Sequence, residues 1–210
     1  WLVLPDLHGT PLASLAVDLL VEIENPCVQL GDVVDVRTPG CSSVQALDEM
    51  IRLKSLKQNA IFLEGNHEAY LLACMNAGRD ISAPFQTGSH EVSAYREIMD
   101  ICGLFPECYR EFLLQLRSEV ETDFLRFVHG HKGGSPEGEN SSSGVHKKKL
   151  VRGHFLTNGF PQEDRFQISC ETGAWLPGQP LCISIVSNTE QSSKLRGWIE
   201  ASEGGVFLVF

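Results

Sequence analysis

The chain has 210 residues, of which 42% are hydrophobic and 21% are charged. This length and composition suit one soluble domain with a sizeable core, and no apolar run reaches the roughly 18 residues that a membrane-spanning helix needs. Lys and Arg total 17 against 27 Asp and Glu, so the formal net charge is −10, which disfavours binding of a nucleic-acid polymer through a basic surface. We therefore predict a single domain over residues 1–210, with neither a nucleic-acid polymer nor a membrane as partner.

The first third of the chain alternates short apolar runs with helical patterns. Thr10-Pro11 reads as an N-cap followed by Pro at the first helical position, and Leu12, Leu15, Leu19 and Leu20 would form the apolar face of that helix. Ser42 or Ser43 would cap a second helix. Expected strands cover residues 1–5, 27–30 and 60–63, and expected helices begin near residues 11, 43 and 67. This alternation indicates parallel βαβ units.

The second half of the chain changes character. Helices are expected over residues 91–101 and 106–116, followed by a hairpin around Thr122-Asp123. Short strands separated by turn residues follow, as in an antiparallel or mixed sheet, at residues 149–155, 166–170, 181–186, 195–200 and 206–210. Residues 132–149 are rich in Gly, Ser and charge, and we read them as a flexible loop within the same domain.

Seven cysteines are scattered along the chain without a CxxC pair. Cys27, Cys170 and Cys182 lie in apolar runs, which favours small buried residues in a reducing compartment over a disulfide framework. No signal peptide is recognisable, and we predict a cytoplasmic protein.

Polar residues follow five of the predicted strands at the point where each strand ends. The carboxyl ends of strands in an α/β sheet form the crevice where ligands bind. Each residue alone has an ordinary structural explanation, such as a turn aspartate, a helix N-cap or a buried histidine. Together they form an oxygen and nitrogen ligand set typical of two divalent metal ions. The set comprises Asp6, His8, Asp32, Asn66, His129 and His154.

The motifs DLHG, GDVVD, GNHE, FVHG and GH occur in the order used by calcineurin-like metallophosphoesterases. The chain resembles their phosphoprotein phosphatase superfamily, which includes bacterial Ser/Thr phosphatases and symmetrical diadenosine tetraphosphatases. The resemblance runs from residue 1 to about residue 185, and ISCETGAW at 168–175 is also similar to bacterial members. It implies an α/β (α+β) sandwich of two mixed β-sheets flanked by helices on both outer faces.

The resemblance also implies a role for each matching residue. Asp6 and His8 would bind one metal, Asn66, His129 and His154 the second, and Asp32 would bridge the two. The two divalent ions, with manganese expected and iron or zinc possible, would activate a water as hydroxide for in-line attack on phosphorus. His67 would be the general acid for the leaving oxygen, held by Asp35.

The arginines that hold phosphate in the family are altered here. Val36 stands where the family has Arg, Arg37 follows one place later, and Glu64 precedes GNHE where an Arg is frequent. Arg37 is the candidate substrate-binding residue, with Arg152, Lys132 or the lysines at 147–149 as alternatives. His131 is expected at the rim of the site, and His90 and His146 at the surface.

The resemblance implies a metal-dependent phosphoester hydrolase, most like a Ser/Thr protein phosphatase, acting on a phosphorylated protein or a small phosphoester. Two alternatives stay open: a symmetrical dinucleoside polyphosphate hydrolase, which shares the metal motifs, and a catalytically weak metal-binding interaction module. His67 and Asp35 argue for an enzyme, because a binding module needs no acid, whereas the altered arginines argue for the module. Hydrolysis of an aryl phosphate would separate enzyme from module, and a phosphopeptide compared with diadenosine tetraphosphate would separate the two enzymes.

Overall fold

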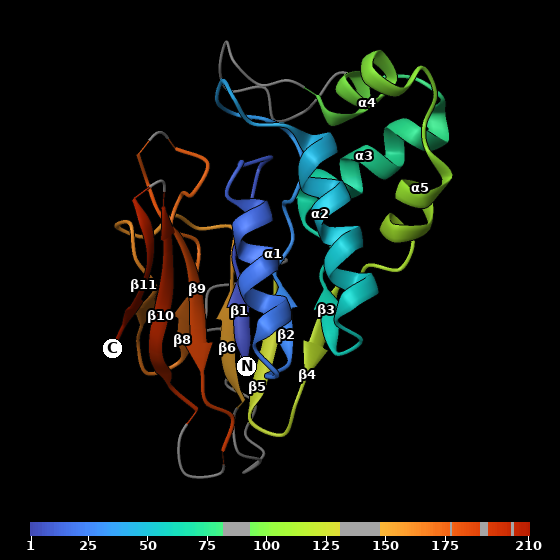
Figure 1. Ribbon diagram of the computed structural model, residues 1–210. Coiled ribbons are helices and arrows are strands. Elements are labelled where there is room, and N and C mark those ends of the chain that lie inside the picture. The colour runs from blue at the N-terminus through green and yellow to red at the C-terminus, as the bar shows by residue number, and fades with distance from the viewer. Residues whose placement is uncertain (82–92, 131–147, 177, 190–192, 203) are drawn as a thin grey trace.

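The computed structural model describes residues 1–81, 93–130, 148–176, 178–189, 193–202 and 204–210. The residues expected to form a flexible loop lie outside the described residues, except Lys148 and Lys149, as do His90, His131 and His146. The described chain forms five helices and two mixed β-sheets (Figure 1). None of the described helices has the length and apolar character that crossing a membrane would require.

The larger sheet has six strands in the order β11-β10-β9-β1-β2-β3. Its parallel half is built from β1 (Leu2–Leu4), β2 (Cys27–Gln29) and β3 (Ala60–Phe62). The helices α1 (Ala13–Glu22) and α2 (Ser43–Leu56) connect these strands, as the βαβ pattern predicts. The antiparallel strands β9, β10 and β11 extend this sheet from the other side of β1; they span Leu181–Val186, Leu195–Ser202 and Gly205–Val209.

The smaller sheet has five strands in the order β4-β5-β6-β8-β7. The expected hairpin is present, because β4 (Glu119–Glu121) pairs antiparallel with β5 (Leu125–Val128). β5 then runs parallel to β6 (Lys149–Arg152), and β6 runs parallel to β8 (Gln167–Ser169), which pairs antiparallel with β7 (Gln162–Glu163). Each sheet therefore contains a run of three parallel strands whose carboxyl ends lie at one edge.

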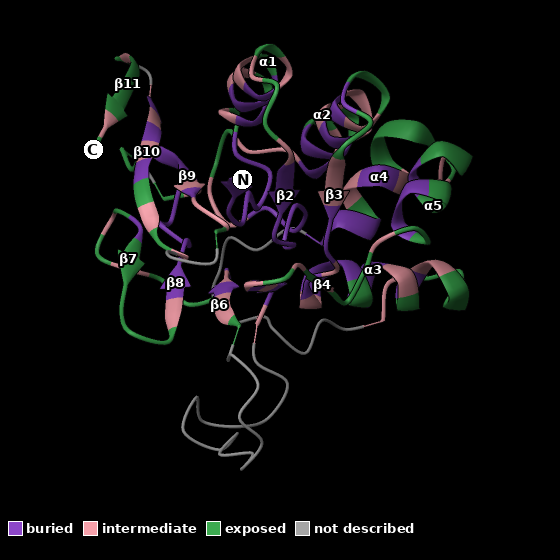
Figure 2. Ribbon diagram, turned by 90° about the horizontal axis from the view of Figure 1, so that it is seen from below, coloured by how far each residue is buried: buried purple, intermediate pink, exposed green. Residues whose placement is uncertain are grey.

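Helices lie over the outer face of the larger sheet. Figure 2 shows α1 and α2 above that sheet, with α3, α4 and α5 beyond its β3 edge; they span Asn66–Ala77, Ala94–Cys102 and Glu107–Leu113. Among the described residues, no helix lies over β6, β7 and β8 (Figure 2). The predicted class, a mixed α/β fold with two mixed sheets and helices, is confirmed, and the expectation of helices on both outer faces is met on one face of the described structure.

The first helix begins two residues later than the sequence predicted. α1 starts at Ala13, and Leu12 precedes it without a side-chain cap. The Thr10 hydroxyl donates to the carbonyl of Ala174, 3.2 Å away, so it is shared with another part of the chain rather than acting as a simple N-cap. Of the predicted apolar face, Leu20 is buried and Leu12, Leu15 and Leu19 pack partly buried against the core, and the helix also buries Ala13, Ala16 and Val17. In contrast, Ser42 does cap α2, accepting the Gln45 amide at 3.2 Å.

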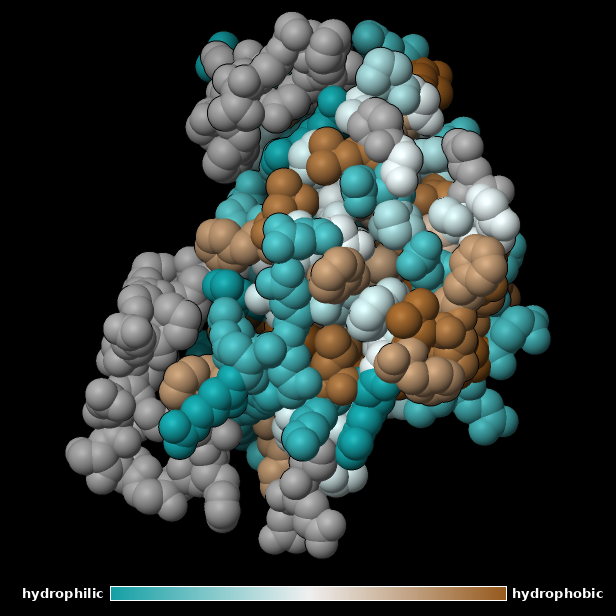
Figure 3. Space-filling model, turned by 90° about the vertical axis from the view of Figure 1, so that its left-hand side faces the viewer, coloured by the Kyte–Doolittle hydropathy of each residue, from teal (hydrophilic) through white to brown (hydrophobic). Residues whose placement is uncertain are grey.

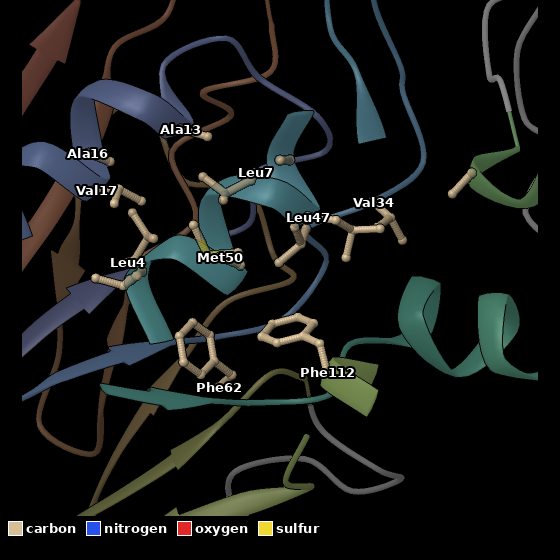
Figure 4. Close-up of a cluster of buried hydrophobic side chains, with 14 of the residues drawn as sticks. Leu4, Leu7, Ala13, Ala16, Val17, Val34, Leu47, Met50, Phe62 and Phe112 are labelled. Carbon is tan, nitrogen blue, oxygen red and sulfur yellow. The ribbon is translucent and has the colours of Figure 1, made fainter. Parts of the chain in front are cut away.

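Two hydrophobic clusters hold the layers together. The larger cluster lies between the six-stranded sheet and the helices, where Leu4, Leu47, Met50 and Phe62 approach one another (Figure 4). The second lies between the two sheets and includes Phe127, which is fully buried. All seven cysteines are free, and Cys27, Cys170 and Cys182 are buried as predicted.

Hydrophobic side chains also remain at the surface. Figure 3 views the side on which β10 and β11 lie and shows hydrophobic residues gathered there among polar ones. β11 contributes exposed Val206, Phe207 and Leu208.

Two of the three leucines of α2 give a matched test of the core. Leu47 is fully buried and Leu56 is 56% exposed. Leu47→Ala should lower the free energy of unfolding by about 2–5 kcal/mol, because it leaves a cavity between helix and sheet. Leu56→Ala should change it by no more than about 0.5 kcal/mol. Urea denaturation measures both, and equal losses would contradict this packing.

Candidate metal centre

The predicted site residues converge around the carboxylate of Asp32. Its Oδ2 atom lies near a ring nitrogen of four histidines: His129 Nε2 at 3.2 Å, His8 Nε2 at 3.7 Å, His67 Nε2 at 3.8 Å and His154 Nδ1 at 4.0 Å. These histidines follow β1, β3, β5 and β6, so both sheets supply the site. The strand-end pattern of the sequence therefore predicted a real cluster.

Tight turns aim these side chains inward. Among the described residues, four that are not glycine have a positive φ: His8 (44°), Asp32 (51°), Asp35 (66°) and His154 (63°). All four were predicted site residues. The left-handed conformation costs about 1–2 kcal/mol for such a residue, and it persists where surrounding structure imposes it.

Two glycines make room for the carboxylates. A Cβ atom on Gly65 would lie 2.2 Å from Asp32 Oδ1, and one on Gly153 would lie 2.3 Å from Asp6 Oδ1. Neither position tolerates a side chain without displacing a carboxylate, which explains why Gly precedes Asn66 and His154 in the motifs.

Glu68 holds the turn that presents Asp32. Its carboxylate is fully buried in the first turn of α3 and accepts the backbone amides of Asp32 and Gly65 through Oε2, and of Val33 and Val34 through Oε1. Burial raises the pKa of Glu68. Glu68 stands in the GNHE motif, and a Glu three residues into a helix is a capping-box signal from which this contact could have been predicted.

Glu171 supports Asp6 in the same way. Its Oε2 accepts the Asp6 amide at 3.0 Å and its Oε1 accepts the Gly173 amide at 2.7 Å. Burial raises the pKa of Glu171 to about 7. The Asp6 carboxylate in turn accepts the His154 amide at 3.1 Å, which ties the end of β1 to the end of β6. Glu171 was not among the predicted site residues, and its place in the ISCETGAW segment is the one sequence signal for it.

Backbone carbonyls fix two histidine rings. The Leu30 carbonyl accepts His129 Nδ1–H at 2.9 Å, and the Val34 carbonyl accepts His8 Nδ1–H at 3.1 Å. The Nε2 atoms therefore turn toward Asp32, an arrangement that orients imidazoles as metal ligands. Burial lowers the pKa of His8 to about 3, which keeps it neutral and able to donate a lone pair.

The acceptor atoms of the site are crowded. His129 Nε2 lies 3.0 Å from Asn66 Oδ1 and 3.1 Å from His154 Nδ1, as well as 3.2 Å from Asp32 Oδ2. Although burial lowers the pKa of His129, the hydrogen bond with Asp32 raises it above its usual value, so a proton can relieve the crowding. A divalent cation would do so in place of that proton, and the mixed oxygen and nitrogen set fits one.

Two groups of ligand atoms share Asp32. His8, Asp32 and His67 form one, and Asp32, His129 and His154 form the other, with the ligand atoms of each group within 4.8 Å of one another. Asp32 is common to both groups, and its role as a bridge stays a prediction. Asp6 belongs to neither group, although its Oδ1 lies 3.8 Å from His129 Nδ1. His67, expected to be an acid, lies as close to Asp32 as His8 does.

His67 also contacts Asp35, its predicted partner, and Arg37, the candidate substrate-binding residue. Its Nδ1 lies 2.7 Å from Asp35 Oδ2, and its Nε2 lies 2.9 Å from Arg37 Nη2. Asp35 Oδ1 accepts the amide of Ala94 at the start of α4, 2.6 Å away. The guanidinium of Arg37 lies 5.0 Å above the ring of Trp175, a residue that sequence reasoning did not assign to the site.

The other candidate phosphate-binding cations differ in where the structure places them. Lys148 and Lys149 pair with Glu121 and Glu163. Arg152 lies beside the site, 4.6 Å above the ring of Phe155. Lys132 and Lys147 are outside the described residues.

Solved structures resemble this fold at low sequence identity. The cold-active protein-tyrosine phosphatase of a psychrophilic Shewanella species is 12% identical, with a TM-score of 0.63; the match covers 100% of this chain and 80% of that one. A point mutant of a cold-active protein tyrosine phosphatase has a TM-score of 0.65 at the same identity and coverage. A metallophosphoesterase from Sphaerobacter thermophilus is 17% identical, with a TM-score of 0.52 and coverage of 89% and 82%. No family model matches the chain, and no curated protein matches it. The chain therefore has a metallophosphoesterase-like fold.

Removing the shared carboxylate should abolish metal binding. Chelator-treated protein titrated with Mn²⁺ should gain thermal stability, because an ion that binds only the native state stabilises it. Asp32→Asn should lose most of the bound metal and that gain. Asp18→Asn, at an exposed position of α1, is the control and should keep both. Wild-type metal content in Asp32→Asn would contradict the assignment.

Glu68 should be essential for stability. Glu68→Gln turns an amide group toward four backbone N–H donors, leaving some of them without an acceptor in a buried site, at about 1–3 kcal/mol for each group left unsatisfied. The matched control is Glu107→Gln, an exposed Glu in the first turn of α5, which should have little effect. Chemical denaturation compares the two, and unchanged stability in Glu68→Gln would refute this role.

Proposed function

We propose that the chain is a metal-dependent phosphoester hydrolase that acts on a phosphorylated protein or a small phosphoester. The observation that carries this proposal is the convergence of carboxylate, amide and imidazole donors on Asp32, next to the His67–Asp35 pair. The phosphatase and metallophosphoesterase structures that share the fold support the same reaction class.

The proposed ligands are Asp6, His8, Asp32, Asn66, His129 and His154. Two divalent ions held there, with manganese as the first choice, would supply Lewis acidity toward a phosphoryl oxygen and lower the pKa of water. The carbonyls of Leu30 and Val34, together with Glu68 and Glu171, would keep the ligands oriented.

His67 is the proposed general acid. Because Asp35 accepts its Nδ1–H, the atom that exchanges a proton is Nε2, and this atom faces the same space as Asp32 Oδ2 and Arg37. Burial lowers the pKa of His67, but the hydrogen bond to Asp35 and the charge of Asp32 raise it above its usual value. In the structure the Arg37 guanidinium donates to Nε2, so Nε2 could hold the acid proton once Arg37 has turned to the phosphate; that proton would then be available for a leaving oxygen.

Arg37 is the proposed phosphate-binding residue. Its guanidinium lies against His67 and the Trp175 ring, while its buried Nε has no hydrogen-bond partner among the described residues. A guanidinium offers paired donors to phosphate, so this side chain can hold an anion beside His67.

A panel of substrates tests the proposal. The Mn²⁺-loaded chain should hydrolyse p-nitrophenyl phosphate, and Asp32→Asn should not. A phosphoserine peptide compared with diadenosine tetraphosphate separates the Ser/Thr phosphatase activity suggested by the resemblance from the dinucleoside polyphosphate hydrolase. Binding of metal without turnover of any substrate would favour the interaction module instead.

The acid role of His67 has a kinetic signature. His67→Asn should lower kcat for an alkyl phosphate by about 10²–10⁴-fold, the usual contribution of general acid catalysis. The loss should be smaller for p-nitrophenyl phosphate, whose leaving group needs little protonation. Metal content, measured on the same samples, should stay near that of the wild type. Equal losses for both substrates would argue against an acid, and loss of metal would make His67 a ligand.

A further inference from the structure

The Trp175 ring contacts two residues that have different proposed roles at the site. It meets the ring of His8 edge to face, with the ring centres 5.5 Å apart, and the guanidinium carbon of Arg37 lies 5.0 Å from its centre. His8 is a proposed metal ligand, and Arg37 is the proposed phosphate-binding residue. Trp175 therefore lies where the metal centre and the phosphate site adjoin.

Hydrogen bonds from two other segments hold the backbone around Trp175. The Thr38 hydroxyl donates to the Trp175 carbonyl at 2.7 Å, and the Thr10 hydroxyl donates to the carbonyl of the preceding residue, Ala174, at 3.2 Å. Because Thr38 follows Arg37 directly in the chain, the first of these bonds ties the loop that carries the guanidinium to the backbone that carries the ring.

Arg37 has few other contacts that fix its guanidinium. Its Nη2 atom lies 2.9 Å from His67 Nε2, and its buried Nε has no hydrogen-bond partner among the described residues. No Asp or Glu of the described chain pairs with it, in contrast to Arg52, Arg96 and Arg126. Within those residues, its guanidinium is held by the indole ring and by the His67 nitrogen.

An aromatic ring holds a guanidinium in a different way from a carboxylate. A carboxylate accepts the N–H donors at the edge of the guanidinium, which are the donors that a phosphoryl group needs. A ring contacts its face instead, so that the N–H donors stay available while the flat group is kept in place. The guanidinium on Trp175 can therefore turn its edge from His67 to a phosphoryl group without leaving the ring.

We propose that Trp175 is the positioning residue of the phosphate site: its ring holds the Arg37 guanidinium beside the metal centre and leaves the N–H donors for the phosphoryl group. Trp175 acts through Arg37 and does not itself contact the substrate. The inference rests on the proposed function. It also gives a physical reason why an arginine one place beyond Val36, the position where the family has Arg, can serve this site.

Phosphate binding in a double-mutant cycle tests this coupling. Inorganic phosphate is titrated by calorimetry into the Mn²⁺-loaded chain and its variants, and metal content is measured on the same samples. Trp175→Leu should raise the dissociation constant about 3–30-fold, the range of a cation–π contact, with unchanged metal content. The same substitution made in Arg37→Gln should have no further effect, because the ring then has no guanidinium to hold. Equal effects in both backgrounds, wild-type affinity in Trp175→Leu, or loss of its Mn²⁺ would overturn the inference.

Three further variants separate positioning from packing. Trp175→Phe keeps a ring face and should recover most of the affinity. Thr38→Val removes the hydrogen bond to the Trp175 carbonyl and should weaken phosphate binding about 2–10-fold, the contribution of one hydrogen bond, and only while Arg37 is present; it decides the question if Trp175→Leu does not fold. Trp198→Leu is the matched control, because Trp198 is also half-buried and stacks on Phe160 with the ring centres 6.0 Å apart. Weaker phosphate binding in Trp198→Leu, or no recovery in Trp175→Phe, would overturn the inference.

Turnover distinguishes this inference from the proposed function. Hydrolysis of p-nitrophenyl phosphate is measured on the samples used for the phosphate titrations. Hydrolysis by a chain whose cycle shows no coupling between Trp175 and Arg37 would leave the proposed function standing and overturn the inference. Coupled phosphate binding without hydrolysis of any phosphoester would do the reverse. A Mn²⁺-loaded wild type that binds no phosphate would also overturn the inference.

Discussion

The burial of the Asp32 carboxylate among four histidines is the constraint on which the site depends. Burial alone would raise the pKa of this carboxyl group, but the hydrogen bond and charge of His129 and the charge of His67 hold it below its usual value. Because Oδ2 faces four ring nitrogens and Oδ1 accepts the His67 amide, neither oxygen can move independently. The turns after β1, β5 and β6 each place a histidine against the Asp32 carboxylate, which the turn after β2 carries.

Both sheets carry turns in which a residue other than glycine adopts the unfavourable left-handed conformation. Four residues in the left-handed conformation together cost several kcal/mol, on the order of 1–2 kcal/mol each, which an isolated loop would relieve by changing shape. Here each turn continues a buried strand, and Glu68 and Glu171 accept the amides that the turns leave without partners. The hydrophobic cluster between the sheets, centred on Phe127, keeps both sets of strand ends at one edge. The geometry of the candidate ligands therefore depends on the packing of the core between the two sheets.

Local chemistry explains how much could be predicted from the sequence. The strand ends, the Ser42 cap and the order of the motifs involve neighbours in the chain, and they predicted that Asp32 and the histidines would converge. They left open which cation reaches His67, and the structure has Arg37 there. The start of α1 was wrong because Thr10 bonds to Ala174, far along the chain, and β7 (Gln162–Glu163) was missed because two exposed polar residues carry no strand pattern. Glu171 and Trp175 depend on the meeting of β1 with the segment after β8, which no local pattern encodes. The roles of the metal ligands and of His67 stay predictions.

The hydrogen bond from the Ala94 amide to Asp35 links the start of α4 mechanically to the ring of His67. α4 is held on the other side by Glu97, which accepts the Ser42 hydroxyl and the Ser43 amide at the start of α2. A small rotation of α4 would therefore withdraw the N–H that steadies Asp35 and let the His67 ring turn, with no change in any proposed metal ligand. The packing of α4 against α2 thus bears on ring orientation at the centre as well as on stability.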